Sequence, residues 1–287
     1  MEKFRIFIQL SRLNKPIGYL LLFWPCAWGI SLGFYFNNNT ILFFKYILLF
    51  FLGSVLMRSA GCIFNDIVDK DLDKKVERTK KRPIPAGKIS VLESFIYIIF
   101  LCSVAFLILL QFNFLTITLG LGSMILAFAY PFMKRITYWP QLFLGLTFNW
   151  GIIMGWTSIT NNLSIEPLIL YLAAIFWTLG YDTIYGLQDI YDDEIIGIKS
   201  TSIKFKNNVK FFVAGCYGLF ALFVLIMFFM IEINKYLLPI SLLFITSLAY
   251  QIKFFKLSDP NSCLKAFKSN NLTGFFVFLF IFSFKIL

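Results

Sequence analysis

The segment from residue 65 to residue 73 carries an amide and carboxylates at a regular spacing. Asn65, Asp69 and Asp73 are each four residues apart, so on a helix they would share one face. Oxygen ligands of this kind suit a hard cation such as Mg²⁺, which keeps free positions for phosphate oxygens when few carboxylates bind it. The spacing therefore predicts a magnesium site, with a solvated helix end as the alternative, since Asp and Asn are common there.

A second acidic segment lies between residues 182 and 194. Asp182, Asp189 and Asp193 follow an i, i+7, i+11 spacing, which predicts another helical stripe with Tyr185 close to it. Asp182 falls inside an apolar run, where an acid costs roughly 2.5–3.5 kcal/mol on insertion scales unless another group compensates. Asp182 is therefore a candidate functional residue. The alternative is that its carboxylate pairs with a group on a neighbouring helix and only stabilises helix packing.

Two acidic helix faces that met would repel each other in a medium of low dielectric constant. Divalent cations between them would remove this repulsion, and two such ions with a diphosphate form a neutralised cluster. Arg78 and Arg82 follow the first segment and could hold phosphate oxygens, although orientation in a membrane would also explain them. The two segments together predict that metal ions hold a diphosphate between them.

Two further polar positions lie in or next to apolar runs. Arg58 precedes Asn65 by two helical turns on the same face, and an arginine in hydrocarbon needs an anionic partner. Asp182 or a bound carboxylate substrate would supply that partner. Tyr130 and Lys134 form another polar pair at the end of an apolar run, although Lys134 could equally extend its ammonium to the membrane interface.

The elements that carry these residues must be membrane helices. Of the 287 residues, 59% are hydrophobic and only 14% are charged, which is too few charges to cover a surface that faces water. Histidine is absent, so imidazole catalysis and histidine-ligated metals are excluded. The five cysteines form no CxxC pair. The net charge of +11 is explained by membrane orientation rather than by binding to nucleic acid, and we expect no nucleic-acid partner.

Nine apolar runs predict an all-α polytopic membrane protein, a bundle of nine transmembrane helices in one domain over residues 1–287. A Gly-Lys-Ser pattern after each acidic segment, at 87–90 and 197–200, suggests two pseudo-repeated halves at about 12–135 and 140–287. The predicted spans are 17–36, 41–64, 92–111, 114–133, 140–160, 165–187, 209–232, 236–252 and 270–286.

The distribution of basic residues predicts the orientation of the bundle. Of the 26 lysines and arginines, 22 fall in the N-terminal segment and in alternate connections, and the connections between these are nearly uncharged. The positive-inside rule then places the N-terminus and both acidic segments on the cytoplasmic side and the C-terminus outside. The N-terminal segment is short, basic and amphipathic, has no small-residue cleavage site, and is expected to belong to the mature protein.

At this point the motifs resemble those of the UbiA-type intramembrane prenyltransferases. The first signature is matched by Asn65-Asp66-x-x-Asp69-x-x-x-Asp73 with Arg78-Thr79-x-x-Arg82-Pro83. The second is matched by Tyr181-Asp182-Thr183-x-Tyr185, Asp189-x-x-Asp192-Asp193 and Gly197-Ile198-Lys199-Ser200-Thr201, in the form typical of members that prenylate 4-hydroxybenzoate. Gly186 stands where Ala would be expected. Further matches are Lys15-Pro16-Ile17-Gly18 and Tyr130-Pro131-x-x-Lys134-Arg135.

The resemblance implies a central cavity open sideways to lipid, two Mg²⁺ ions, and transfer of a polyprenyl group from its diphosphate to 4-hydroxybenzoate, ortho to the hydroxyl, in ubiquinone biosynthesis. It also implies a site near the cytoplasmic face of the cell inner membrane. The implied metal ligands are Asn65, Asp69, Asp73, Asp189 and Asp193. These four aspartates are expected to be catalytic together with Asp182. The expected substrate-binding residues are Arg58, which would meet the acceptor carboxylate, and Asn65, Arg78, Arg82, Tyr130, Lys134, Tyr185 and Lys199.

Two other readings stay open. A related prenyltransferase with a haem, naphthoate or homogentisate acceptor shares the first motif, but the second motif disfavours it. An ion-coupled transporter would be expected to show charged or broken helices near the midplane in both halves. Here only Arg58 and Asp182 lie deep in apolar runs, and the other acids cluster at one membrane face, which favours an enzyme.

Overall fold

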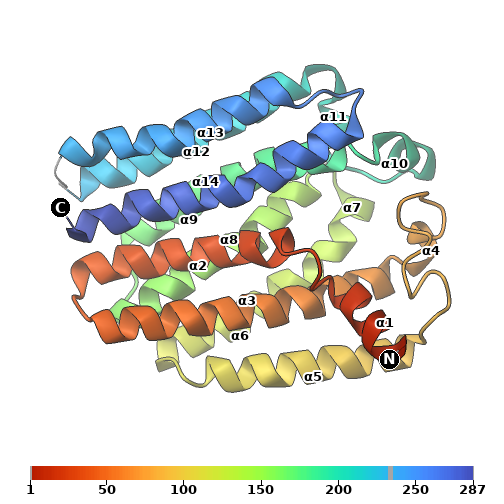
Figure 1. Cartoon of the computed structure of the whole chain (residues 1–287), viewed down its shortest axis with the longest axis horizontal. Coiled ribbons are helices and arrows are strands. Elements are labelled where there is room, and N and C mark those ends of the chain that lie inside the picture. The colour runs from red at the N-terminus through yellow and green to blue at the C-terminus, as the bar shows by residue number, and fades with distance from the viewer. Residues whose placement is uncertain (1, 232–234, 287) are drawn as a thin grey trace.

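The chain folds into helices joined by short connections. The computed structural model describes residues 2–231 and 235–286, and no strand occurs among them. Figure 1 shows the long helices lying side by side. The helices are α1 (Glu2–Ser11), α2 (Ile17–Phe36), α3 (Thr40–Val68), α4 (Lys70–Asp73), α5 (Val91–Leu109), α6 (Phe114–Ala129), the 3₁₀ helix η1 (Tyr130–Phe132), α7 (Met133–Ile136), α8 (Pro140–Thr160), α9 (Ile165–Gly186), α10 (Ile190–Ile196), α11 (Thr201–Lys204), η2 (Lys206–Asn208), α12 (Val209–Met230), η3 (Lys235–Ile240), α13 (Ser241–Phe254) and α14 (Pro260–Ile286).

Nine helical segments in the described part of the chain are long and apolar enough to cross a membrane, which confirms the predicted number of spans. One boundary was wrong by more than a few residues: α14 begins at Pro260 instead of residue 270. Its first turns carry Asn261, Lys265, Lys268 and Asn270, and this polarity hid them from a search for apolar runs. Lys265 and Lys268 therefore belong to α14 and not to the connection before it.

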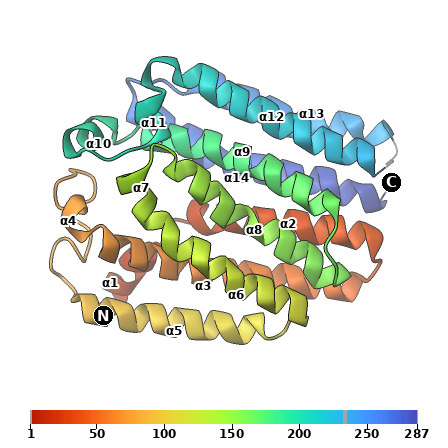
Figure 2. The same ribbon diagram turned by 180° about the vertical axis from the view of Figure 1, so that it is seen from behind.

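The short elements gather at one end of the bundle. In Figures 1 and 2, α4, α7, α10 and α11 lie at the end where the chain begins, and the C-terminus lies at the opposite end. At the centre, α2 packs against α3, α8 and α14, and α9 packs against α8 and α12. The first acidic segment occupies the end of α3 and α4, and the second occupies the end of α9 and α10. Both segments are thus brought to the same end of the bundle.

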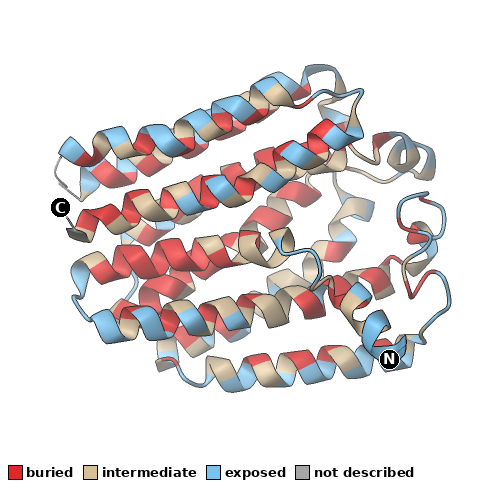
Figure 3. Cartoon of the chain, viewed as in Figure 1, coloured by how far each residue is buried: buried red, intermediate tan, exposed pale blue. Residues whose placement is uncertain are grey.

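Two glycines let the central helices α2 and α8 approach closely. A Cβ on Gly29 would overlap the carbonyl oxygen of Ile152, and a Cβ on Gly155 would overlap that of Cys26. Small residues commonly allow membrane helices to pack in this way. Figure 3 shows α2 largely buried, whereas the outer helices expose much of their surface. On α5 the exposed side chains include Ile99, which suits contact with lipid.

The two acidic loops end in the same kind of turn. Gly87 and Gly197 have φ angles of 71° and 80°, in the left-handed region that glycine adopts easily. Three residues after each glycine, Ser90 and Ser200 accept a backbone hydrogen bond at the start of the next helix, at 3.1 and 3.2 Å. The loops therefore share the turn that their sequences suggested, and the division of the whole chain into two related halves stays a prediction.

Candidate active site

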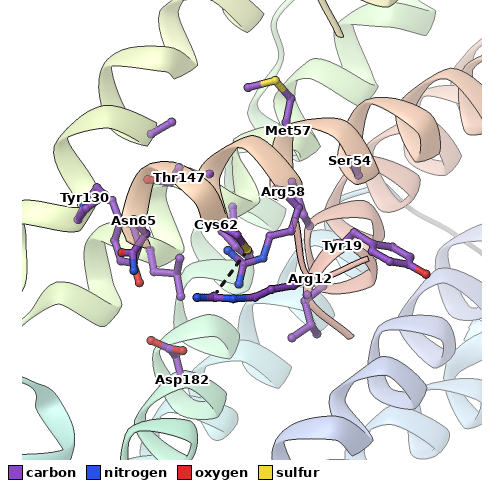
Figure 4. Close-up of a pocket in the computed structure, with 18 of the residues that line it drawn as sticks. Arg12, Tyr19, Ser54, Met57, Arg58, Cys62, Asn65, Tyr130, Thr147 and Asp182 are labelled. Carbon is purple, nitrogen blue, oxygen red and sulfur yellow. Dashed lines mark hydrogen bonds between the residues drawn. The ribbon is translucent and has the colours of Figure 1, made fainter. Parts of the chain in front are cut away.

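A cavity of about 1170 Å³ opens among the helices at the end that carries the acidic segments. Its walls come from α2, α3, α5, α6, α8, α9 and α14 and from both acidic loops. Figure 4 shows part of it, with Asn65, Arg58 and Asp182 around one space. All thirteen residues predicted for the site line this cavity: Arg58, Asn65, Asp69, Asp73, Arg78, Arg82, Tyr130, Lys134, Asp182, Tyr185, Asp189, Asp193 and Lys199.

The first acidic segment keeps its helical spacing although α3 ends within it. The backbone N–H of Asp69 donates to the carbonyl of Asn65 at 2.9 Å, and that of Asp73 donates to the carbonyl of Asp69 at 2.8 Å. Asp69 itself stands between α3 and α4 as the residue that ends one helix and precedes the next. The predicted shared face is confirmed. Asp73 is buried and Asp69 is fully inaccessible to solvent, whereas Asn65 is half-buried.

The second acidic segment is not one continuous stripe, which corrects the sequence prediction. Helix α9 ends at Gly186, and the next three backbone N–H groups bond three residues back, to Ile184, Tyr185 and Gly186, which turns the chain more tightly than an α-helix does. A new helix, α10, then carries Asp193, whose N–H donates to Asp189 at 2.9 Å. The tight turn changes the angular position of Asp189 and Asp193 relative to α9, yet both side chains still line the cavity.

Gly186 allows a close contact at this turn. A Cβ on Gly186 would overlap the hydroxyl of Ser202, which donates to the carbonyl of Thr183 at 2.8 Å. The chain that returns after the second acidic loop is therefore fastened directly beneath the end of α9. An alanine here, as expected from the family pattern, would require Ser202 to move.

Basic side chains join the two acidic segments. Lys134 on α7 pairs with Asp69, and Arg82 bonds Asp73 at 2.8 Å. Arg78 lies in the loop after α4 and pairs with Asp189 of the other segment. The acidic and basic groups that were predicted separately thus form one charged cluster at the mouth of the cavity.

Two carboxyl groups of the site, those of Asp69 and Asp193, have raised pKa values. Burial raises the pKa of Asp69, and the charge of Lys134 opposes that rise. Burial, and then repulsion from Asp189, raises the pKa of Asp193 to about 7. Carboxyls with raised pKa values in a cavity gain most from an additional positive charge close by.

The donor set fits a hard divalent cation. Among residues 2–231 and 235–286, no three acidic, cysteine or histidine side chains converge as a metal site, and Asp69, Asp73 and Asp189 are paired with side-chain cations. One oxygen nevertheless lacks a hydrogen bond: Oδ1 of Asp69 is buried and has only the guanidinium of Arg135 at 3.6 Å. Carboxylate oxygens together with the amide oxygen of Asn65 are the ligands that Mg²⁺ prefers.

Deeper in the cavity, Arg58 and Asp182 face the open space from α3 and α9 (Figure 4). Neither belongs to an ion pair within the described residues, so the suggested direct pair between them is not formed. The guanidinium carbon of Arg58 lies 5.4 Å from the ring of Phe148, and its Nε is buried without a hydrogen-bond partner. A bound carboxylate therefore stays a candidate for the direct partner of Arg58.

Two of the predicted side chains have contacts that the sequence did not indicate. The ammonium of Lys199 donates to the carbonyl of Ile136 at 3.2 Å, and its backbone N–H donates to Lys134 at 2.9 Å. Lys199 thus fastens the second loop to α7 at the rim of the cavity. The hydroxyl of Tyr185 accepts a hydrogen bond from Arg78 at 3.1 Å.

A largely buried ion pair in the wall of the same cavity was not predicted from the sequence. Arg12, which follows α1 with a φ of 54°, bonds Asp66 at 2.5 Å, and Arg82 bonds the same carboxylate oxygen at 3.0 Å. Asp66 follows Asn65 directly, so helical geometry turns it about 100° away from the Asn65 face. Because Asp66 points away from the other acids, its carboxylate requires a separate positively charged partner, and this much could have been predicted from the sequence. The partner itself comes from a segment 54 residues earlier, which no local pattern indicates.

Comparison with known proteins agrees with this geometry. Residues 22–281 match the UbiA prenyltransferase family. The chain is 41% identical over 281 residues to the mitochondrial 4-hydroxybenzoate polyprenyltransferase of Bos taurus, covering 95% of this chain and 73% of that protein. It is 40% identical over 283 residues to the 4-hydroxybenzoate octaprenyltransferase of Psychromonas ingrahamii, covering 98% and 96%.

Solved structures share the fold. A UbiA homolog from Aeropyrum pernix K1 superposes with a TM-score of 0.77 at 21% identity, covering 94% of this chain and 99% of that one. A UbiA homolog from Archaeoglobus fulgidus, solved with GPP and Mg²⁺, gives 0.73 at 19% identity, covering 98% and 100%. With its multiple membrane spans and the family match over most of its length, the chain belongs to the UbiA prenyltransferase family.

Proposed function

We propose that the protein transfers a polyprenyl group from polyprenyl diphosphate to 4-hydroxybenzoate, at the ring carbon ortho to the hydroxyl, as a step of ubiquinone biosynthesis. The names of its relatives, at about 40% identity over nearly the whole chain, support the two substrates. The observation that carries the proposal is structural: two acidic segments and the basic loop between them line one cavity.

The donor diphosphate binds at the mouth of the cavity. Asn65, Asp69, Asp73, Asp189 and Asp193 would hold two Mg²⁺ ions, which neutralise the diphosphate and make it a better leaving group. Arg78, Arg82 and Lys134 already lie among these acids, so each can exchange a carboxylate for a phosphate oxygen by a small side-chain movement. Lys199 and Tyr185 complete the rim.

The acceptor binds deeper. Arg58 would meet the carboxylate of 4-hydroxybenzoate, because its guanidinium lines the cavity within a membrane-spanning helix and belongs to no ion pair among the described residues. Asp182 and Tyr130, which also line this space, would face the phenol end of the ring. We assign to Asp182 the role of steering the phenol hydroxyl so that the neighbouring carbon points toward the donor.

The reaction begins when the C–O bond of the prenyl diphosphate breaks and its electron pair leaves with the diphosphate. Aromatic side chains in the cavity, among them Tyr19 and Phe267, shield the resulting allylic cation from water and stabilise it through their ring faces. The ortho carbon of the acceptor supplies the electron pair for the new C–C bond. The released diphosphate accepts the ring proton, which restores the aromatic ring.

The lipid-soluble donor requires that the protein work inside a bilayer. We place it in the cell inner membrane, or in the corresponding mitochondrial membrane where the relatives are mitochondrial, with the acidic end toward the cytoplasm or matrix. The basic residues at that end support this orientation. The prenyl tail would extend between the helices into lipid, so we expect lipid, but no nucleic acid, among the partners.

Prenyl transfer can be tested in membranes that contain the protein. Polyprenyl diphosphates of several lengths would be supplied with 4-hydroxybenzoate, and the products would be identified by mass, with and without EDTA. We expect a prenylated 4-hydroxybenzoate that forms only when Mg²⁺ is present. A product formed from a naphthoate or homogentisate acceptor instead would favour the related prenyltransferases, and ion flux without any product would favour a transporter.

A further inference from the structure

Arg58 lies directly against the backbone of α2. A Cβ placed on Gly18 would be 2.9 Å from Nε of Arg58 and 3.6 Å from its guanidinium carbon. Heavy atoms that are not bonded to each other are most stable at about 3.5–4.0 Å, so an alanine at position 18 would force the arginine to move. Arg58 can therefore occupy this position because residue 18 is a glycine and has no side chain.

The ring of Phe148 on α8 provides a second contact. Its centroid lies 5.4 Å from the guanidinium carbon of Arg58, within the range in which a cation is attracted to an aromatic ring. Helices α2, α3 and α8 therefore each contribute one residue to this place in the cavity wall: Gly18, Arg58 and Phe148. A long, flexible side chain is thus held in place from two other helices.

The guanidinium that these contacts hold has no carboxylate in direct contact with it in the described part of the chain. None of the ion pairs in the described residues includes Arg58. A cation fixed in position before its anion arrives loses little freedom on binding, and it accepts that anion at one place only. The position of Arg58 therefore sets where a negative group of the acceptor can lie.

We propose that Gly18 and Phe148 are positioning residues that fix Arg58 and thereby select an acceptor whose carboxylate lies opposite its hydroxyl on the ring. This inference rests on the proposed function, because it requires 4-hydroxybenzoate as the acceptor. Arg58 would make the contact with the substrate, and Gly18 and Phe148 would act through it.

The first test compares a charged with an uncharged acceptor. For Gly18→Ala we expect kcat/KM for 4-hydroxybenzoate to fall about tenfold, mainly because KM rises. This is the size of effect expected when the contact between Arg58 and the substrate carboxylate is displaced. With methyl 4-hydroxybenzoate, which has no carboxylate charge, we expect less than a twofold change, and the KM for the donor should stay the same. Phe148→Leu should lower kcat/KM for 4-hydroxybenzoate by about threefold, as expected from loss of the cation–π contact with Arg58.

A matched control is a glycine in another helix with free space around it. Gly218 lies in α12, where an added Cβ would have no atom within 4 Å, and it does not line the cavity. Gly218→Ala should leave every kinetic constant within about twofold, as surface substitutions do. Thermal melting of all variants checks that they remain folded.

A double-mutant cycle separates positioning from a general structural effect. Alanine at position 58 has no side-chain atom beyond Cβ that a Cβ on residue 18 could displace, so Gly18→Ala should change kcat/KM by less than about twofold in an Arg58→Ala background. A tenfold loss that persisted there, or an equal loss with the methyl ester, would overturn the inference. If the wild-type enzyme does not prenylate 4-hydroxybenzoate at all, the proposed function is overturned together with the inference. If the wild type is active and the Gly18→Ala variant is equally active, only the inference is overturned.

Discussion

The guanidinium of Arg78 pairs with the carboxylate of Asp189, which lies 111 residues further along the chain. Its Nε is 2.8 Å from Oδ1, and the same guanidinium donates to the hydroxyl of Tyr185 at 3.1 Å. The loop of the first acidic segment therefore contacts the second segment across the mouth of one cavity. This is the relationship that a diphosphate site shared by both segments requires.

Replacing Arg78 by Gln should affect catalysis far more than stability. We expect kcat/KM for the prenyl diphosphate to fall about 100-fold, since a charged donor to the leaving group is lost. Its ion pair is partly exposed, and pairs of that kind contribute only about 0–1 kcal/mol to folding. Steady-state kinetics and thermal melting would be measured together. Lys80→Gln, which removes an exposed charge from the same loop, is the control, and equal effects of both substitutions would contradict the assignment.

Asp69→Asn should abolish measurable prenyl transfer. The substitution removes a buried charge from the proposed metal site and leaves Lys134 without its carboxylate, so we expect a loss of about 10³-fold in kcat. Asp71 provides the matched control, because it lies two residues away with its side chain 89% exposed and, in the described part of the chain, forms an ion pair with Lys74 alone. Asp71→Asn should retain activity within about twofold. Equal activity of the two variants would show that the charge of Asp69 has no special role.

Asp66→Asn should reveal a structural role for the ion pair that the sequence did not predict. The side chain of Asp66 is 1% exposed and is shared by Arg12 and Arg82, so neutralising it leaves Arg12 without its carboxylate partner and Arg82 with Asp73 alone. Breaking a buried pair of this kind costs about 3 kcal/mol, which should lower the melting temperature by several degrees. If melting stays unchanged while activity is lost, Asp66 acts in the chemistry and not in the support of the loop.

Asp182→Asn tests the role assigned to the deeper carboxylate. We expect kcat to fall at least tenfold while the KM for the donor changes little, because Asp182 lines the cavity away from the cluster of ion pairs. Product analysis by mass and fragmentation would show whether the ring is still prenylated at the carbon next to the hydroxyl. Turnover equal to that of the wild type would remove Asp182 from the mechanism.

Local patterns in the sequence were sufficient for the helices and for one acidic segment. Nine apolar runs predicted the spans, and the four-residue spacing of Asn65, Asp69 and Asp73 predicted a shared face that the backbone hydrogen bonds confirm. Both features depend on residues within a few turns of one another. Helical periodicity describes such residues directly.

Features that depend on distant segments could not be predicted in this way. The tight turn after Gly186 broke the expected stripe, and Ser202, which contacts that glycine, lies beyond the next helix. The pairs formed by Arg78 with Asp189 and by Arg12 with Asp66 depend on how the helices pack. The polar start of α14 was missed because Asn270 is satisfied by Gln251 and Trp177 from other helices, and its composition alone resembles a loop.

The central claim is that acids from both segments hold one diphosphate through divalent ions. The direct measurement is calorimetric binding of a non-hydrolysable prenyl thiodiphosphate to the purified protein, in Mg²⁺ and in EDTA, for wild type, Asp69→Asn, Asp189→Asn and the double variant. We predict binding in Mg²⁺ only, a loss of at least tenfold in each single variant, and no further loss in the double variant because one cluster is already broken. Equal affinity in EDTA, or losses from the two substitutions that simply add, would contradict the account.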